Sequence, residues 1–206
     1  QRYMKLSVDA IMAIAFAIAL GIVSVSRLFA PIFWGEDFAP CAYILSALAL
    51  SIPFSGFANV IRMQYLIPNG MDGAYILSVI LGAVSNLTAN SLLIPRCGAL
   101  GAAVGTVIAE GVVCAAQCLA VKKRIDILAY LKSTAFFGMA GLLMYGAVRV
   151  LDQRAEITVS WLLLEIVVGG SVYCILSVLY LYHTKNELLM TALQKLGGAH
   201  QNNDRG

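Results

Sequence analysis

The chain has 206 residues, of which 60% are hydrophobic and 12% are charged, whereas an ordinary soluble domain is roughly 25% charged. A water-soluble fold of this length cannot bury so much apolar surface, so the composition indicates a helical membrane protein. The net charge of +3 is small and the basic residues lie in a few loops, so we expect no nucleic-acid partner.

Apolar runs of about 20 residues recur along the chain, and each is long enough to cross a bilayer as a helix. They predict transmembrane helices over residues 8–30, 39–66, 74–95, 99–121, 133–150 and 157–182, followed by a cytoplasmic tail over residues 183–206. In the second run, Pro53 and Gly56 predict a kinked or broken helix, because proline removes a helical hydrogen bond. The expected fold is an all-α polytopic bundle of about six transmembrane helices.

Basic residues are divided unequally between alternate connections of this bundle. One side receives Arg2, Lys5, Arg62, Lys122, Lys123, Arg124, Lys132, Lys185, Lys195 and Arg205. The other side receives only Arg96, Arg149 and Arg154, with Arg27 near its boundary. Because lysine and arginine accumulate in cytoplasmic loops, this division predicts that both termini are cytoplasmic.

Two acidic residues, Glu110 and Glu165, lie inside apolar runs. An ionised side chain at the centre of a bilayer costs at least about 2.5–3.5 kcal/mol, so each needs a partner, a watery cavity or a function. Three interpretations stay open for them. Each glutamate can hold a proton, pair with a base on another helix, or serve as the ion-coupling group of a transporter.

Asn86 and Asn90 are one helical turn apart in the third run, so they share a helix face. Hydrogen bonding to a neighbouring helix is the favoured interpretation, and the lining of a polar cavity is the alternative. In the fourth run, Gly98, Gly101 and Gly105 have the spacing of small residues that let two helix backbones approach closely.

Arg27, Arg62 and Gln64 lie at the predicted ends of helices. They are candidates for binding an anionic headgroup or a substrate phosphate, and the alternative is that the arginines anchor helix ends at the membrane surface. The five cysteines show no CxxC spacing, and Cys114 and Cys118 have no histidine near them in sequence, so we expect packing rather than a metal site. No motif of a nucleophile with its base is present, and we expect neither an enzyme nor a cofactor.

Several stretches carry a resemblance to a known family. They are residues 33–38 (FWGEDF), 64–70 (QYLIPNG), 86–90 (NLTAN), 93–110 (LIPRCGALGAAVGTVIAE) and 122–125 (KKRI). These stretches resemble the C-terminal half of polysaccharide flippases of the Wzx type, whose exporter superfamily also contains MATE drug antiporters and the lipid II flippase. The resemblance implies that residues 1–206 form the C-terminal lobe of a two-lobed transporter, with the N-terminal lobe in the same or a separate chain.

The resemblance also implies a function at the bacterial inner membrane, among its lipids. A Wzx-type flippase moves an undecaprenyl-diphosphate-linked oligosaccharide to the outer leaflet for lipopolysaccharide or other surface polysaccharide, alongside glycosyltransferases and a polymerase. Arg27 and Arg62 would then bind the diphosphate, and Asn86, Asn90 and Glu110 would line or brace the cavity. The alternatives are a cation-coupled multidrug antiporter that uses Glu110 or Glu165, and a truncated membrane scaffold.

Overall fold

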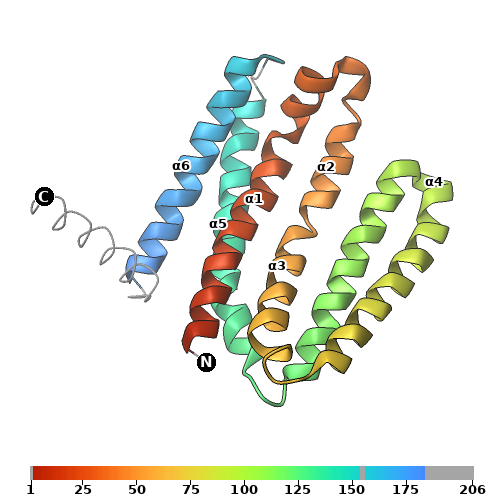
Figure 1. The fold of residues 1–206 in the computed structure, drawn as a ribbon. Coiled ribbons are helices and arrows are strands. Elements are labelled where there is room, and N and C mark those ends of the chain that lie inside the picture. The colour runs from red at the N-terminus through yellow and green to blue at the C-terminus, as the bar shows by residue number, and fades with distance from the viewer. Residues whose placement is uncertain (1, 154–155, 184–206) are drawn as a thin grey trace, which may run out of the picture.

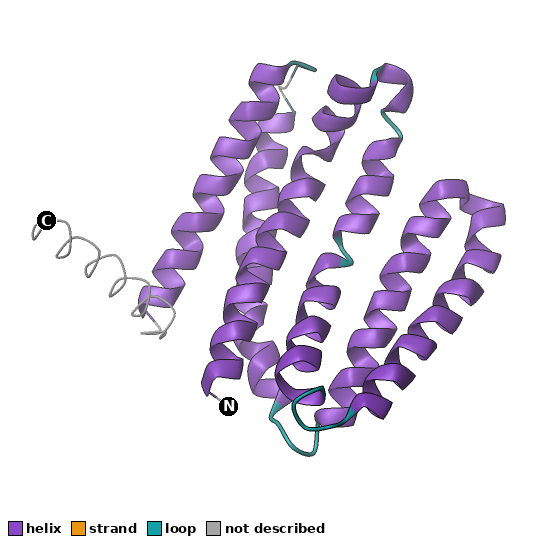
Figure 2. Cartoon of the chain, viewed as in Figure 1, coloured by secondary structure: helices purple, strands orange, loops and turns teal. Residues whose placement is uncertain are grey.

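The computed structural model describes residues 2–153 and 156–183, so the predicted tail beyond His183 lies outside the described residues. Within these two ranges every regular element is helical and no strand is present (Figure 2). The long elements are α1 (Arg2–Trp34), α2 (Cys41–Ala49), α3 (Ile52–Ile61), α4 (Asp72–Val121), α5 (Ile127–Asp152) and α6 (Val159–His183), with the short 3₁₀ helix η1 (Glu36–Phe38) and the π-helical η2 (Arg62–Leu66). The predicted all-α class is confirmed.

Five helical stretches are long and apolar enough to cross a membrane: α1, the combined stretch Cys41–Leu66, α4, α5 and α6. The 50 residues of α4 would extend about 75 Å as a straight helix, more than twice the hydrocarbon core of a bilayer. Instead α4 folds back at Gly98 into two arms that run in opposite directions (Figure 1). The chain therefore forms the expected bundle of about six membrane-crossing stretches.

Gly98 makes the turn of α4 because its backbone angles, φ 54° and ψ −133°, lie in a region that favours glycine. The two arms then pack closely through small residues. A Cβ atom on Gly101 would meet the backbone of Leu93, and a Cβ atom on Gly105 would meet the side chain of Asn90. The small-residue spacing predicted close helix packing, and the structure places it between the two arms of one hairpin.

The second crossing is broken where α2 ends and α3 begins, at Leu50 and Ser51. Pro53 lies in the first turn of α3, where its missing N–H costs least, so the interruption falls just before the proline and not at Gly56.

The start of α5 also differs from the prediction. Helix α5 begins at Ile127, several residues early, because the side chain of Asp126 accepts a hydrogen bond from the Ala129 N–H at 3.1 Å.

Helix α1 is central to the arrangement, because it packs against α2, α3, α5 and α6, while α4 packs on α2 and α3 (Figure 1). The end of the bundle that carries the N-terminus of α1, η2 and residues 122–126 is called the inner end. The opposite end, with η1 and the α5–α6 connection, is called the outer end. The described segments with the larger basic group lie at the inner end, where the charge distribution predicts cytoplasm.

Candidate functional site

A polar cavity of about 280 Å³ lies between α3 and both arms of α4, in the inner half of the bundle. This inner cavity is lined by Ser55, Ala58, Asn59, Arg62, Tyr75, Val79, Glu110, Val113 and Gln117. Arg62, a predicted ligand of the substrate phosphate, and Glu110, predicted to line or brace the cavity, therefore lie at one cavity although they are far apart in sequence. The chain reversal at Gly98 brings the second arm of α4, and with it Glu110, to the place where α3 ends.

Neutral groups hold the Arg62 guanidinium in place. Its Nη2 donates to Asn59 Oδ1 at 2.5 Å and its Nη1 lies 3.5 Å from the Tyr75 hydroxyl. The guanidinium carbon is 5.3 Å from the centroid of the Tyr75 ring, a distance at which the ring face attracts a cation. Among the described residues, Nε of Arg62 is buried without a hydrogen-bond partner and no carboxylate forms an ion pair with it. Its charge is therefore available to an anion in the cavity.

The opposite wall of the inner cavity is a single stripe on the second arm of α4. Glu110, Val113 and Gln117 follow each other at helical spacing and line the cavity together. The Gln117 side chain is buried, and its Nε2 donates to Ser78 Oγ on the first arm at 3.1 Å. Gln117 was not predicted, although a glutamine seven residues after Glu110 in an apolar run was a usable signal.

The other candidates on these elements have different surroundings. Gln64 lies in η2, is exposed, and is not among the residues that line the inner cavity. Asn90 donates its Nδ2 to Asn86 Oδ1 at 2.9 Å along the same arm. The Oδ1 atom of Asn90 faces Gly105 on the second arm. The asparagine pair therefore packs within the hairpin and does not join Arg62.

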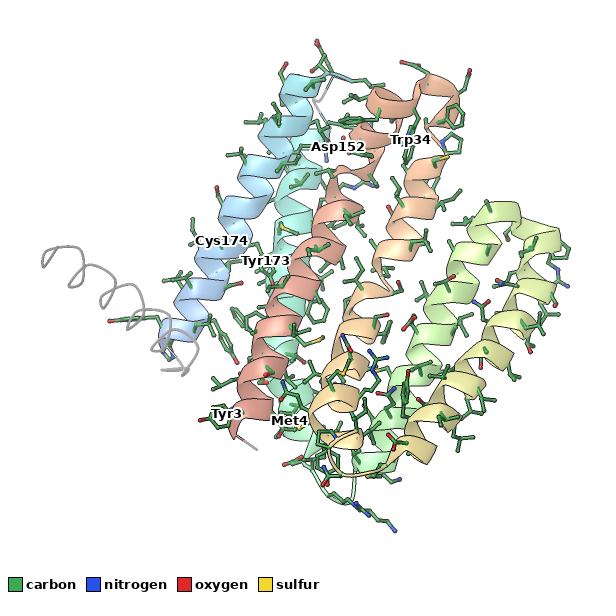
Figure 3. The ribbon with its side chains drawn as sticks, viewed as in Figure 1. Tyr3, Met4, Trp34, Asp152, Tyr173 and Cys174 are labelled. Carbon is green, nitrogen blue, oxygen red and sulfur yellow. The ribbon has the colours of Figure 1, made fainter. Side chains whose placement is uncertain are left out.

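A second cavity, of about 520 Å³, lies at the outer end between α1, α2 and α5. This outer cavity is lined by Val23, Ser26, Arg27, Ala39, Pro40, Ala42, Tyr43, Ser46, Tyr145 and Arg149. Asp152 is buried beside it and accepts hydrogen bonds on the same oxygen, Oδ2, from Arg27 at 2.9 Å and from Arg149 at 2.8 Å. Figure 3 shows Asp152 at the end of the bundle opposite Tyr3 and Met4. Arg27 and Arg62 therefore do not converge on one site.

Glu165 belongs to neither polar cavity. It is 1% exposed on α6 and lines an apolar cavity of about 330 Å³ formed with α1 and α5. Among the described residues neither of its carboxyl oxygens has a hydrogen-bond partner. Its surroundings favour the uncharged form, because an ionised carboxylate is costly to bury without partners.

Comparison with known proteins shows which solved structure has a similar fold. Neither protein-family models nor curated proteins match the sequence. Among solved structures, the chain is similar to the lipid II flippase MurJ in its inward closed conformation, with a TM-score of 0.74 and 19% sequence identity. The fold is MurJ-like. The similarity covers 88% of this chain and 39% of the MurJ chain, so the MurJ-like bundle corresponds to somewhat more than a third of that transporter.

Proposed function

We propose that this protein is one lobe of a flippase that moves an undecaprenyl-diphosphate-linked oligosaccharide across the bacterial inner membrane for surface polysaccharide synthesis. The observation that carries the proposal is Arg62, a cation without an acidic partner among the described residues, in a polar cavity of a MurJ-like bundle. Guanidinium groups bind phosphate oxygens through paired N–H donors. The headgroup diphosphate is the part of such a substrate that Arg62 would hold.

The remaining polar residues of the inner cavity would hydrogen-bond the sugar part of the substrate. Asn59, Tyr75 and Gln117 offer amide and hydroxyl groups of the kind that bond sugar hydroxyls. Glu110 is half-buried in the same wall and supplies an acceptor for hydroxyl protons. A cavity with one cation, one acid and several neutral polar groups fits a substrate that carries its charge in the headgroup and hydroxyl groups in its sugar.

The proposal includes a second lobe, from the same or a separate chain, because the resemblance covers 39% of the MurJ chain. The first arm of α4 exposes a run of large apolar side chains that a lipid tail or a second lobe would cover. They are Ile76, Leu77, Val79, Ile80, Leu81, Val84 and Leu87. Glycosyltransferases and a polymerase would supply and use the transported oligosaccharide.

Replacing Arg62 tests the proposal in cells that depend on this protein for surface polysaccharide. Arg62→Gln should abolish surface polysaccharide and cause lipid-linked precursor to accumulate, because the headgroup loses its cationic contact. Lys123→Gln is the matched control, since Lys123 is an exposed cation at the same end of the bundle and does not line the cavity. Wild-type polysaccharide from the Arg62 variant, at equal protein level, would contradict the proposal.

A cation-coupled antiporter is the second candidate, and the position of Glu110 in the inner cavity favours it. In that case Glu110→Gln should abolish drug resistance conferred by the protein, because the coupling carboxylate is lost. A flippase that uses Glu110 only to contact sugar would confer no such resistance. Drug susceptibility and surface polysaccharide, measured in the same variant, separate the two functions.

A further inference from the structure

Four charged side chains gather near the outer end of α1, α5 and α6: Arg27, Arg149, Asp152 and Glu165. Arg27 and Arg149 share a single oxygen of Asp152, whose side chain is 2% exposed. The other oxygen of Asp152 is buried without a partner among the described residues. One carboxylate therefore neutralises only one of the two arginines, and this part of the cluster carries one excess positive charge.

The excess charge faces an open polar cavity. The arginine side chains are 61% and 48% exposed, and both line the outer cavity. Hydroxyl groups complete its wall, with Ser26 and Ser46 in a mutual hydrogen bond at 2.8 Å and Tyr145 accepting from Arg149 Nε at 3.0 Å. Two guanidinium groups and several hydroxyls around about 520 Å³ are donors that match a phosphate group.

Glu165 is the remaining acid of the cluster, and its charge state sets the net charge of the four side chains. The charged groups that act on it are Arg27 from α1 and both Arg149 and Asp152 from α5. On its own helix, Tyr173 lines the same apolar cavity, but its hydroxyl donates to the Ala13 carbonyl at 2.6 Å. Glu165 is therefore within the electrostatic influence of two arginines without bonding either.

The surroundings of Glu165 select a proton over a metal cation. Hard cations such as Ca²⁺ take about six to eight oxygen ligands. Besides the carboxyl group, the apolar cavity supplies the hydroxyls of Ser24 and Tyr173. Two carboxyl oxygens and two hydroxyl oxygens are fewer side-chain ligands than such a cation takes.

We propose that the outer cavity binds a phosphate-bearing anion between Arg27 and Arg149, and that a proton on Glu165 controls its affinity. With Glu165 neutral, the cluster has a charge of +1 and attracts the anion. With Glu165 ionised, the cluster is neutral and its electrostatic attraction for the anion is weaker. By linkage, a bound anion in turn strengthens proton binding at Glu165. This site goes beyond the proposed function, which depends on Arg62 at the inner end.

The test measures anion binding to the purified protein in nanodiscs of zwitterionic lipid, by calorimetry at about pH 5 and about pH 9. The probes are sulfate and short-chain phosphatidylglycerol, which keep a constant charge over this range. Wild-type affinity should fall at least about tenfold from the acidic to the basic condition, because the site loses one unit of positive charge. Glu165→Gln should bind at both pH values with the affinity that the wild type has at acidic pH.

Matched variants make the result specific. The proteins in this assay also carry Arg62→Gln, so that the inner cavity does not bind the probe. In this background Glu110→Gln, which removes an acid from the inner cavity, should keep the pH dependence, and Arg149→Gln should lose binding at both pH values. If Glu165→Gln does not fold, Asp152→Asn replaces it and should bind more tightly than the wild type at acidic pH, because both arginines lose their carboxylate.

The two probes separate the sources of the anion. If sulfate binds, a free anion is enough to occupy the site. If only phosphatidylglycerol binds, the site recognises a lipid headgroup. Either result supports the site when binding shows the expected pH dependence. Absence of binding by both probes, or unchanged pH dependence in Glu165→Gln, would overturn the inference. Neither result would affect the outcome for Arg62 in cells.

Discussion

Gly105 shows how one residue positions others in this bundle. Its Cα lies against Asn90 Oδ1, so the two arms of α4 touch where the Asn86–Asn90 pair is bonded. Farther along the same arm, Gly111 has open space around its Cα. Two glycines on one helical arm therefore have opposite packing environments.

This difference predicts opposite effects of adding a methyl group. Gly105→Ala should lower the free energy of unfolding by about 1–3 kcal/mol, because the new Cβ collides with Asn90. Gly111→Ala should be neutral or stabilising by up to about 1 kcal/mol, because alanine favours the helix. Both values follow from reversible unfolding in mixed micelles.

A double substitution checks the cause. Asn90→Ala removes the atom that Gly105→Ala would meet, so the combined variant should lose less stability than the sum of the two single variants. Strict additivity of the two changes would show that Gly105 is needed for another reason.

The residues of the candidate site that could be predicted are charged residues in or beside an apolar run. Arg62 and Glu110 stood out in this way and share the inner cavity. Gln117 and Asp152 were missed because one is uncharged and the other lies at the end of a crossing, where an acid is not unusual. The division of the arginines between two cavities was not predictable, since it depends on how the helices pair in space.

At the scale of elements, the turn of α4 depends on the backbone of Gly98. A Cβ atom at Gly98 would meet nothing within 4 Å, so only its positive φ of 54° opposes a substitution. Gly98→Ala should destabilise the protein by about 1–3 kcal/mol through backbone strain. Gly73→Ala is the control, because Gly73 is also unobstructed but lies in regular helix. Equal stability of the two variants, measured by the same unfolding assay, would contradict this explanation.

Element boundaries were predicted less well than element number. Hydropathy reports which residues suit lipid, and it does not report where a helix continues into water. Helix α1 therefore begins at Arg2, before the predicted run, and α5 begins next to the capping side chain of Asp126. The break at Leu50 and Ser51 was expected from Pro53, but its position follows from the tolerance of proline in the first turn of a helix.

For the whole molecule, the orientation gives a direct prediction. Cys97 is exposed and adjoins the turn at Gly98, between the two arms of α4. In intact cells, with the other four cysteines replaced, a membrane-impermeant thiol reagent should label Cys97. A Lys123→Cys variant on a cysteine-free background should be labelled only after the membrane is opened, because residues 122–126 lie at the inner end. The reverse pattern would invert the orientation.

The fold class followed from composition and periodicity because a bilayer permits few architectures. Backbone groups in lipid must be paired within the chain, so long apolar runs become helices that cross the membrane. The order in which these helices pack does not follow from the same argument. The close contact of α4 with α2 and α3, and not with α6, emerged only from the three-dimensional arrangement.

Side-chain hydrogen bonds tie α1 to two neighbours along most of its length. Ser133 bonds to Asp9 at 2.6 Å, Tyr173 bonds to the carbonyl of Ala13 at 2.6 Å, and Arg27 bonds to Asp152 at 2.9 Å. Helix α1 is thus fastened to α5 and α6 at two points one helical turn apart in its inner half, and to α5 again near the outer end. The three helices form a block whose members cannot slide past one another without breaking these bonds.

The interruption at Leu50 and Ser51 is the point at which the second crossing could bend. It is a joint in the one crossing that packs both against α1, in this fastened block, and against the α4 hairpin. Because α1 and α4 each pack against both α2 and α3, bending at the joint would shift α3, and Arg62 after it, against both neighbours. Such a bend would reshape the inner cavity, whose wall includes Asn59 of α3, and would leave unbroken the ion pairs beside the outer cavity, which involve only α1 and α5.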